Sequence, residues 1–192
     1  MDNKQIAKRI RESWETVLAF VANQTRKKEG DKIRKGSLLV LDCTSEEDEQ
    51  RSEGLFLNEL VRMFDPSIKA HVEPVQDKDT FYKIFKKAKE PTMHISSHGK
   101  HYIRNQKING KYCKGTNLFF PSGEWLSSDE LRELLSSKID RERPKMVIMS
   151  ACEGGGEDMV RAMNQGGCRY FIAPSDETYW FDAATFIGLF YC

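Results

Sequence analysis

The residue of this chain best suited to covalent chemistry is Cys152. It follows an apolar run, residues 145–151, and is soon followed by three consecutive glycines, 154–156. An apolar run that stops at such a turn predicts a buried strand with the thiol at its C-terminal end. Open α/β sheets form their sites at that edge, so Cys152 is predicted to be a nucleophile within reach of substrate.

His98 and Gly99 are the residues predicted to serve this thiol. They follow a second apolar run, 93–97, and parallel strands bring their C-terminal ends to one edge. A cysteine is mostly protonated at neutral pH, and a neighbouring histidine is the usual base that removes the proton. An attacked carbonyl also needs donors for its developing negative charge. The backbone N–H groups of Gly99 and Cys152 are the expected pair.

Each of these residues also has a plainer explanation. A lone cysteine after a strand is more often a packing residue than a nucleophile, and the His98-Gly99 pair is equally weak when taken alone. His94 lies on the same strand face as His98, four residues further back, and is expected to be structural. The other two histidines, His71 and His101, are expected to be exposed.

The sequence predicts no metal and no cofactor. The five cysteines are an odd number without a Cys-x-x-Cys pair, so neither a zinc site nor a disulfide framework is indicated. The strand histidines have no carboxylate at metal-ligand spacing. Glycines 154–156 lack the third glycine of a dinucleotide fingerprint, and no Gly-Lys-Ser/Thr phosphate loop occurs. A phosphatase loop would need an arginine where Asp158 stands.

The overall charge of the chain favours no class of partner. Lysine and arginine number 30 and aspartate and glutamate 29, for a net charge of +1. This balance gives no electrostatic reason to expect nucleic acid or an anionic membrane as the main partner. No segment has the roughly 20 apolar residues of a membrane span, and the N-terminus lacks the apolar core of a signal peptide. A cytoplasmic protein is therefore expected.

The elements that must position the candidate residues alternate between strands and helices. Apolar runs predict strands at 37–42, 70–75, 92–97, 145–151 and 169–173. Helical spacing and capping patterns predict helices opening near 45–48, over 81–88, from Ser127 or Ser128, over 158–165 and at 181–191. Such alternation is typical of an α/β fold with a mostly parallel sheet of five to six strands and helices on both faces.

The length of the chain suits a single domain. Residues 1–35 are predicted to be an amphipathic helix and a charged connector, and residues 36–192 the α/β domain. That domain carries an inserted segment near 100–125, in which Asn109-Gly110 has the sequence of a hairpin turn. Because mobile loops at the edge of a site often assemble or block it, the insertion suggests that activity is switched.

Three motifs, in order along the chain, resemble those of one family. His94-Ile-Ser-Ser-His98-Gly99 is similar to a strand that ends in His-Gly, and Ser150-Ala-Cys152-Glu-Gly-Gly to a Ser-Ala-Cys-Glu-x-Gly segment. Ala173-Pro-Ser-Asp176-Glu-Thr, followed by Phe190-Tyr191, is similar to an acidic turn and a closing helix. A histidine roughly 50 residues before the cysteine is also the caspase spacing. Over residues 37–191 the chain therefore resembles the caspase-like cysteine proteases, the clan of caspases, separase and gingipains, and within it the CHAT domain family.

This resemblance implies a caspase-hemoglobinase fold and hydrolysis of a peptide bond. His98 would be the general base and acid, Cys152 the nucleophile, and the N–H groups of Gly99 and Cys152 the oxyanion donors. Asp176, by likeness to relatives that cleave after basic residues, would line the substrate pocket, with Asp42 as the second choice. Asp176 is equally well explained as a helix cap before residues 179–184.

The expected function is a cysteine endopeptidase that cleaves a specific protein, with a preference for a basic P1 residue and with activity controlled by a regulatory protein partner or by processing. The resemblance also implies, for a bacterial protein, a role in antiviral defence or cell death. Ala173 departs from the family, which has an aromatic residue before the pocket turn. Many relatives continue past the position of Cys192, so the chain is either a compact member or part of a longer protein.

Two other functions remain open at this stage. The first is an inactive caspase-like scaffold, which keeps the His98–Cys152 pair but never aligns it. The second is a flavodoxin-like or receiver-like signalling domain, because the same strand and helix order permits it. That second alternative leaves the pairing of His98 with Cys152 unexplained.

Overall fold

The computed structural model describes residues 37–44, 53–64, 69–108, 111–175 and 177–178. All of them belong to one compact unit, Lys35–Cys192. The helix predicted within 1–35, the capping pattern at 45–48 and the last helix at 181–191 lie outside the described residues.

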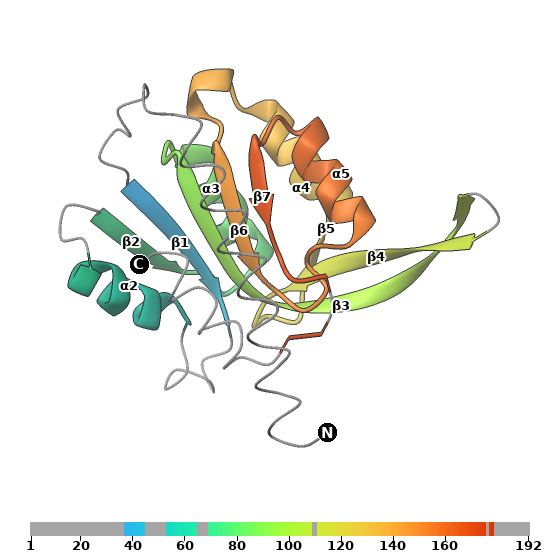
Figure 1. The fold of residues 1–192 in the computed structure, drawn as a ribbon, viewed down its shortest axis with the longest axis horizontal. Helices are drawn as coiled ribbons and strands as arrows, with labels where there is room; N and C mark the ends of the chain where they lie inside the picture. The colour runs from blue at the N-terminus through green and yellow to red at the C-terminus, as the bar shows by residue number, and fades with distance from the viewer. Residues whose placement is uncertain (1–36, 45–52, 65–68, 109–110, 176, 179–192) are drawn as a thin grey trace, which may run out of the picture. The chain divides into compact units, whose positions relative to one another are not determined.

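A seven-stranded sheet forms the centre of this unit (Figure 1). Five strands are parallel and lie in the order β2-β1-β3-β6-β7. These strands are β1 Ser37–Cys43, β2 Lys69–Pro74, β3 Thr92–Ile108, β6 Met146–Ser150 and β7 Tyr170–Ile172. Every predicted strand is confirmed. Pro74 ends an edge strand, a position in which a proline removes no hydrogen bond from the centre of a sheet.

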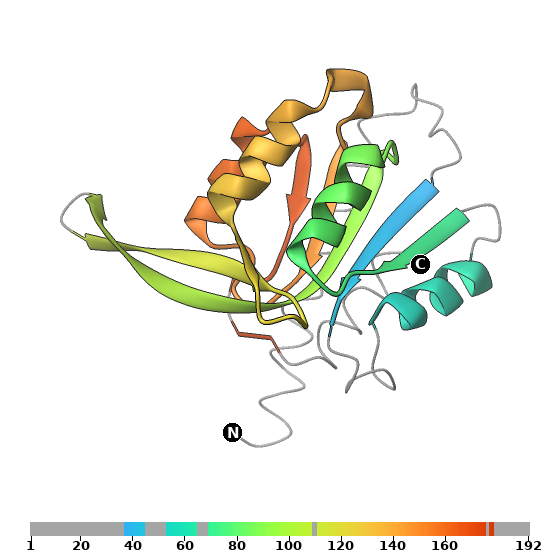
Figure 2. The same ribbon diagram turned by 180° about the vertical axis from the view of Figure 1, so that it is seen from behind.

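Helices cover both faces of the sheet (Figures 1 and 2). One face carries α2, Glu53–Phe64, and the other carries α3, Lys78–Lys87, α4, Ser128–Ser137, and α5, Glu157–Gln165. A short 3-10 turn, η2, Asp140–Glu142, connects α4 to β6. The chain thus has the α/β fold with a mostly parallel sheet that its alternating pattern predicted.

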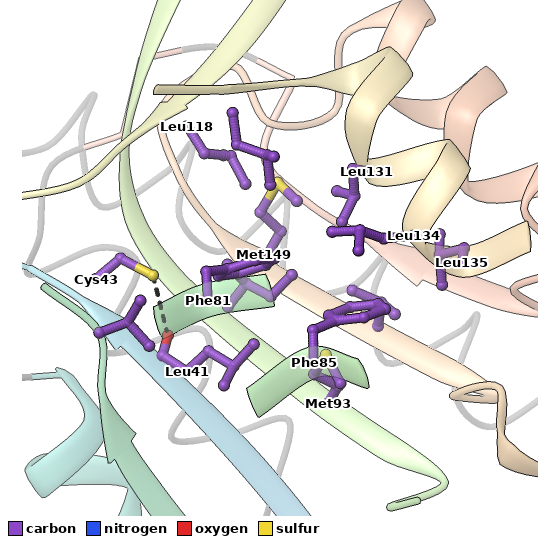
Figure 3. Packing of buried hydrophobic residues seen from close by; sticks show 14 of the residues in the cluster. Leu41, Cys43, Phe81, Phe85, Met93, Leu118, Leu131, Leu134, Leu135 and Met149 are labelled. Atoms are coloured by element: carbon purple, nitrogen blue, oxygen red, sulfur yellow. Dashed lines mark hydrogen bonds between the residues drawn. The ribbon is translucent and has the colours of Figure 1, made fainter. Parts of the chain in front are cut away.

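The larger hydrophobic core lies between the sheet and helices α3, α4 and α5 (Figure 3). Phe81 and Phe85 of α3 are buried there beside Met93, with their ring centroids 5.7 Å apart. Burying each such side chain contributes about 1.5–3 kcal/mol. Alternate residues of β1 point to opposite faces, yet both Val40 and Leu41 have 0% exposure. Burial on both faces explains why this strand is a continuous apolar run.

Local sequence sets the ends of the helices. Ser127 caps α4, because its hydroxyl accepts a hydrogen bond from the Glu130 N–H while the Glu130 carboxylate accepts one from the Ser127 N–H at 2.9 Å. This capping box contributes about 1 kcal/mol and confirms the predicted start of the helix. α5 ends at Gly166, and Gly167 then adopts a φ of 86°, a left-handed conformation that favours glycine.

Strand β3 corrects one prediction, namely that His98 ends a strand. β3 extends from Thr92 to Ile108. Its first part pairs in parallel with β1 and β6, but from His98 onward it pairs antiparallel with β4, Lys111–Phe119, in the register His98↔Phe119. β4 supplies backbone hydrogen-bond partners there, so the strand continues beyond the edge of the parallel sheet.

The hairpin predicted around Asn109-Gly110 is confirmed by the pairing of Ile108 with Lys111, while the two turn residues themselves lie outside the described ranges. After β4 the chain turns into a short strand, β5, Trp125–Ser127, which pairs antiparallel with β4. The segment predicted as an insertion near 100–125 therefore forms an antiparallel extension of the sheet.

Candidate active site

The end of β6 and the middle of β3 meet at the edge of the parallel sheet. Their last paired residues are Ser96 and Ser150. Just beyond, the backbone of Gly99 lies directly against that of Cys152: a Cβ atom on Gly99 would be only 2.1 Å from the Cys152 carbonyl oxygen. Only glycine permits this approach. The structure thus brings His98-Gly99 and Cys152 together, although 53 residues separate Gly99 from Cys152 in the chain.

Two consecutive turns shape the chain around the thiol. The Gly154 N–H donates to the Ala151 carbonyl at 2.9 Å, and the Gly156 N–H donates to the Glu153 carbonyl at 3.0 Å. Glu153 belongs to both turns and has a φ of 57°, a left-handed conformation that costs a non-glycine residue roughly 1–2 kcal/mol. Ala151 and Gly154 are buried, whereas Cys152 is half-buried. The turn therefore leaves Cys152 partly exposed between buried Ala151 and buried Gly154.

Thr116 and Asp158 hold this turn in place. Thr116 is fully buried, and its hydroxyl donates to the Glu153 carbonyl at 2.8 Å. Its N–H donates to the Asp158 carboxylate at 3.2 Å, in the first turn of α5. The base of the β3–β4 hairpin, the turn and α5 are thus joined. Nothing in the sequence links a threonine in a hairpin to a strained turn far along the chain, so this pair could not be predicted as part of the site.

The segment after β7 lies against the thiol. The Cys152 Sγ is 3.5 Å from the Thr178 carbonyl oxygen, and the Gly155 N–H donates to the Pro174 carbonyl at 2.7 Å. Asp176, the predicted pocket residue, lies between these contacts in the sequence but outside the described residues. Its role as a pocket residue or as a helix cap stays a prediction.

The histidines occupy different surroundings. His98 is exposed, and its predicted role as the base stays a prediction. His94 has 0% exposure, and its Nε2 lies 3.1 Å from the Ser150 Oγ, which suits the structural role expected for it. His71 is exposed, as expected, and its Nε2 is 3.0 Å from a Glu73 carboxylate oxygen. The side chain of His101 lies outside the described part of the chain.

Asp42 lies at the same edge but its carboxylate is engaged within the protein. In the β1–β3 register it is opposite Ser96. Its Oδ1 accepts hydrogen bonds from the Thr44 N–H at 3.2 Å and from the Thr44 hydroxyl at 2.6 Å. Gly54, in the first turn of α2, approaches so closely that a Cβ there would be 2.8 Å from Oδ2. A carboxylate near a helix N-terminus is stabilised by the helix dipole, so these contacts explain Asp42 without a substrate.

Cys152 differs from the other described thiols in its exposure. Cys43, Cys152 and Cys168 are free cysteines. Burial raises the pKa of the Cys43 thiol, and the negative charge of Asp42 adds to that effect. Burial also raises the pKa of the Cys168 thiol. These two buried thiols are held in the protonated, unreactive form, which leaves Cys152 as the accessible one among the three.

The described residues contain no group of three or more histidine, cysteine or acidic side chains that could hold a metal ion. In the same part of the chain, no helix is both long and apolar enough to cross a membrane.

No protein-family model matches the chain, and no curated protein matches it. Among solved structures the chain is similar to NtrX from Brucella abortus, in a crystal structure of its complex with ADP, with 14% sequence identity and a TM-score of 0.36. The match covers 81% of this chain and 26% of that chain, so the chain spans about a quarter of the length of NtrX. At this TM-score the likeness assigns the chain to no family.

Proposed function

We propose that the chain is a cysteine endopeptidase of the caspase-like type, with Cys152 and His98 as its catalytic dyad. The observation that carries this proposal is the contact between the Gly99 and Cys152 backbones, with the Cβ position of Gly99 2.1 Å from the Cys152 oxygen. A sheet could place a histidine and a cysteine anywhere along two strands. Here the backbone contact brings the residue next to exposed His98 against half-buried Cys152, at the edge where parallel sheets form their sites.

The proposed reaction has two steps. His98 accepts the proton of the Cys152 thiol, and Sγ forms a bond to the peptide carbonyl carbon. The backbone N–H groups of Gly99 and Cys152 donate to the carbonyl oxygen as it becomes negative. The C–N bond then breaks, His98 gives its proton to the leaving amine, and a thioester remains on Cys152. Water activated by His98 attacks the thioester, which releases the acid and restores the thiol.

The substrate is proposed to be a specific protein cleaved after a basic residue. Support for a pocket at this place comes from Pro174 and Thr178, which contact the cysteine turn on either side of Asp176 in the sequence. Since the Asp42 carboxylate is engaged by Thr44, the turn that carries Asp176 is the better candidate for holding a basic side chain. A cytoplasmic location, a regulatory protein partner and a role in antiviral defence belong to the same proposal through the family resemblance.

A second candidate function is a catalytically silent scaffold of the same fold. The observation that favours it is the distance of 3.5 Å between the Cys152 Sγ and the Thr178 carbonyl. A thiol that donates to a carbonyl is protonated and is not an active nucleophile. In an enzyme this contact would break when substrate or a partner arrives, whereas in a scaffold it would persist.

The test is hydrolysis of a panel of fluorogenic peptides with arginine, lysine or neutral P1 residues, by the wild type and by Cys152→Ala, His98→Ala and Cys168→Ala. Wild type and Cys168→Ala are expected to cleave the basic peptides and the dyad variants are not. Equal turnover by all four proteins would overturn the proposal. If no protein is active, labelling by an acyloxymethyl ketone decides: reaction at Cys152 no faster than at buried Cys168 would favour the scaffold.

A further inference from the structure

The β3–β4 hairpin extends beyond the sheet as a two-stranded ribbon, which we define as residues 100–108 and 111–116. β3 pairs with the parallel sheet no further than Ser97, and β4 begins to pair with β5 only at Asn117. Between these points the described pairing joins each strand only to the other. Figures 1 and 2 both show the ribbon projecting away from the helices. The ribbon therefore protrudes from the sheet and could enter a groove of a partner.

The base of the ribbon is stiff. A Cβ on Gly115 would lie 2.4 Å from the ring of Tyr102, so the ring lies directly across the opposite strand. Thr116, the next residue, is tied to Glu153 and Asp158 by the hydrogen bonds described above. A ribbon fixed at its base keeps its direction, which lowers the entropy that binding would cost.

The ribbon is strongly cationic. Its five cations are Lys100, Arg104, Lys107, Lys111 and Lys114, and the sequence has no aspartate or glutamate from residue 100 to 123. The net charge of the whole chain is only +1, so the remainder of the chain is acidic. The near-zero net charge of the whole chain gave no reason to expect nucleic acid, but that charge is a sum over all residues. It does not describe this segment, which is locally cationic.

The register places cations on both faces of the ribbon. Lys111 and Lys114 are three residues apart on β4, so they belong to opposite faces. Lys100 pairs with Asn117, an even number of residues from Lys111, and Lys107 pairs with Tyr112, two residues from Lys114. Each face therefore carries at least two cations at register positions.

A projecting ribbon with cations on both faces matches a partner that has a groove with two negatively charged walls. The major groove of B-form DNA is about 12 Å wide and admits a two-stranded β-ribbon. Phosphates line both of its walls, and the amide residues Asn105 and Gln106, within the register shift of β3, are of the type that reads adenine in that groove. The major groove of A-form RNA is too narrow for such an element.

We propose that this ribbon binds double-stranded DNA in the major groove. The proposal does not depend on protease activity, although β3 runs from the ribbon directly into His98-Gly99 and so joins the two sites. The alternative partner is an acidic protein with a cleft. It would contact the same cations, but the match between the ribbon and the width of the DNA major groove would then play no part in binding.

The test measures fluorescence anisotropy of a labelled 20-base-pair DNA duplex with the full chain between 50 and 200 mM NaCl. Neutralising five phosphates would give a slope of log affinity against log salt of about −4.5, an affinity loss of about 500-fold over this range. In Lys107→Ala/Lys111→Ala/Lys114→Ala the slope is expected to shrink to about −1.8, a loss of about 12-fold. The matched control removes three exposed lysines of α3, Lys83, Lys86 and Lys87, and should keep the wild-type slope.

Competition identifies the partner. A 20-base-pair RNA duplex of the same sequence and a polyglutamate peptide are expected to bind at least about tenfold more weakly than the DNA, because neither offers a wide groove with charged walls. Tighter binding of RNA or polyglutamate, equal slopes in the two triple variants, or no binding of DNA at 50 mM NaCl would each overturn the proposal. None of these results affects the test of Cys152, so the two proposals fail separately.

Discussion

His94 and His98 lie four residues apart on one face of β3, but their surroundings differ. His94 is fully buried with its Nε2 3.1 Å from the Ser150 hydroxyl. His98 is exposed beside the Gly99–Cys152 contact. Inside the sheet no substrate can reach the pair, so it stabilises the strands. At the edge, the strained turn at Glu153 leaves Cys152 half-buried. We call His94 and Ser150 the inner pair, and His98 and Cys152, the proposed dyad, the outer pair.

The largest expected effect is the difference in kcat/KM between Cys152→Ala and Ser150→Ala. Cys152→Ala removes the nucleophile, so kcat/KM for a basic-P1 peptide should fall by at least about 1,000-fold. The free energy of unfolding should change by less than about 1 kcal/mol, because the side chain is only half-buried. Ser150→Ala should keep kcat/KM within about fivefold of the wild type. If Ser150→Ala were as inactive as Cys152→Ala, the distinction between the inner and outer pair would be wrong.

The next effect concerns the contact that brings the outer pair together. In Gly99→Ala the new Cβ would lie 2.1 Å from the Cys152 carbonyl, so β3 or the turn must shift. A displacement of about 1 Å is expected to lower kcat/KM by about 100-fold. Peptide hydrolysis and urea unfolding of the same variant measure the effect.

The control for Gly99→Ala is Gly123→Ala. Gly123 has a φ of 85° but no atom within 4 Å of its Cβ position. Its substitution should cost about 1–2 kcal/mol of stability through strain alone and leave kcat/KM unchanged. Full activity in Gly99→Ala would contradict the proposed arrangement of the site.

The inner pair is expected to affect stability rather than catalysis. His94→Ala leaves a cavity and removes the hydrogen bond to Ser150, so the free energy of unfolding should fall by about 2–4 kcal/mol in urea denaturation. The double variant with Ser150→Ala should show a coupling energy of about 0.5–1.5 kcal/mol. For the folded His94→Ala protein kcat/KM should stay near the wild-type value. A loss approaching that of Cys152→Ala would place His94 in the chemistry instead.

The smallest expected effect is on the pH dependence of stability, and it concerns the buried thiol of Cys43 rather than Cys152. Because burial raises the pKa of Cys43, the folded protein holds this proton more tightly than the unfolded chain does. Its contribution to stability is complete below the unfolded pKa, about 8.5, and is lost as the pH rises above that value. In Cys43→Ala the decline in stability above about pH 8.5 should be shallower by up to about 1.4 kcal/mol per pH unit. A decline as steep as that of the wild type in urea unfolding would contradict this cause.

Much of the fold was predictable because burial leaves a direct trace in the sequence. β1 is buried on both faces, and its sequence is accordingly an uninterrupted apolar run. The cap at Ser127 and the end of α5 at Gly166-Gly167 were predictable because they depend on residues close in the chain. The end of β3 was predicted wrongly because it depends on β4, a partner that the apolar pattern of residues 92–97 does not reveal.

The sequence by itself determined the order, along the chain, of the residues that could carry chemistry. One apolar run leads to His98-Gly99, a later one leads to Cys152, and a cationic segment without acidic residues begins at Lys100. These are properties of local pattern and composition. Only the tertiary structure decided that Gly99 touches Cys152, that Thr116 holds the Glu153 turn, and that Asp42 is engaged by Thr44 rather than facing open solvent. The physical reason is that these contacts join residues through packing and strand register, and hydrogen-bond geometry of this kind has no counterpart in the linear pattern of residue types.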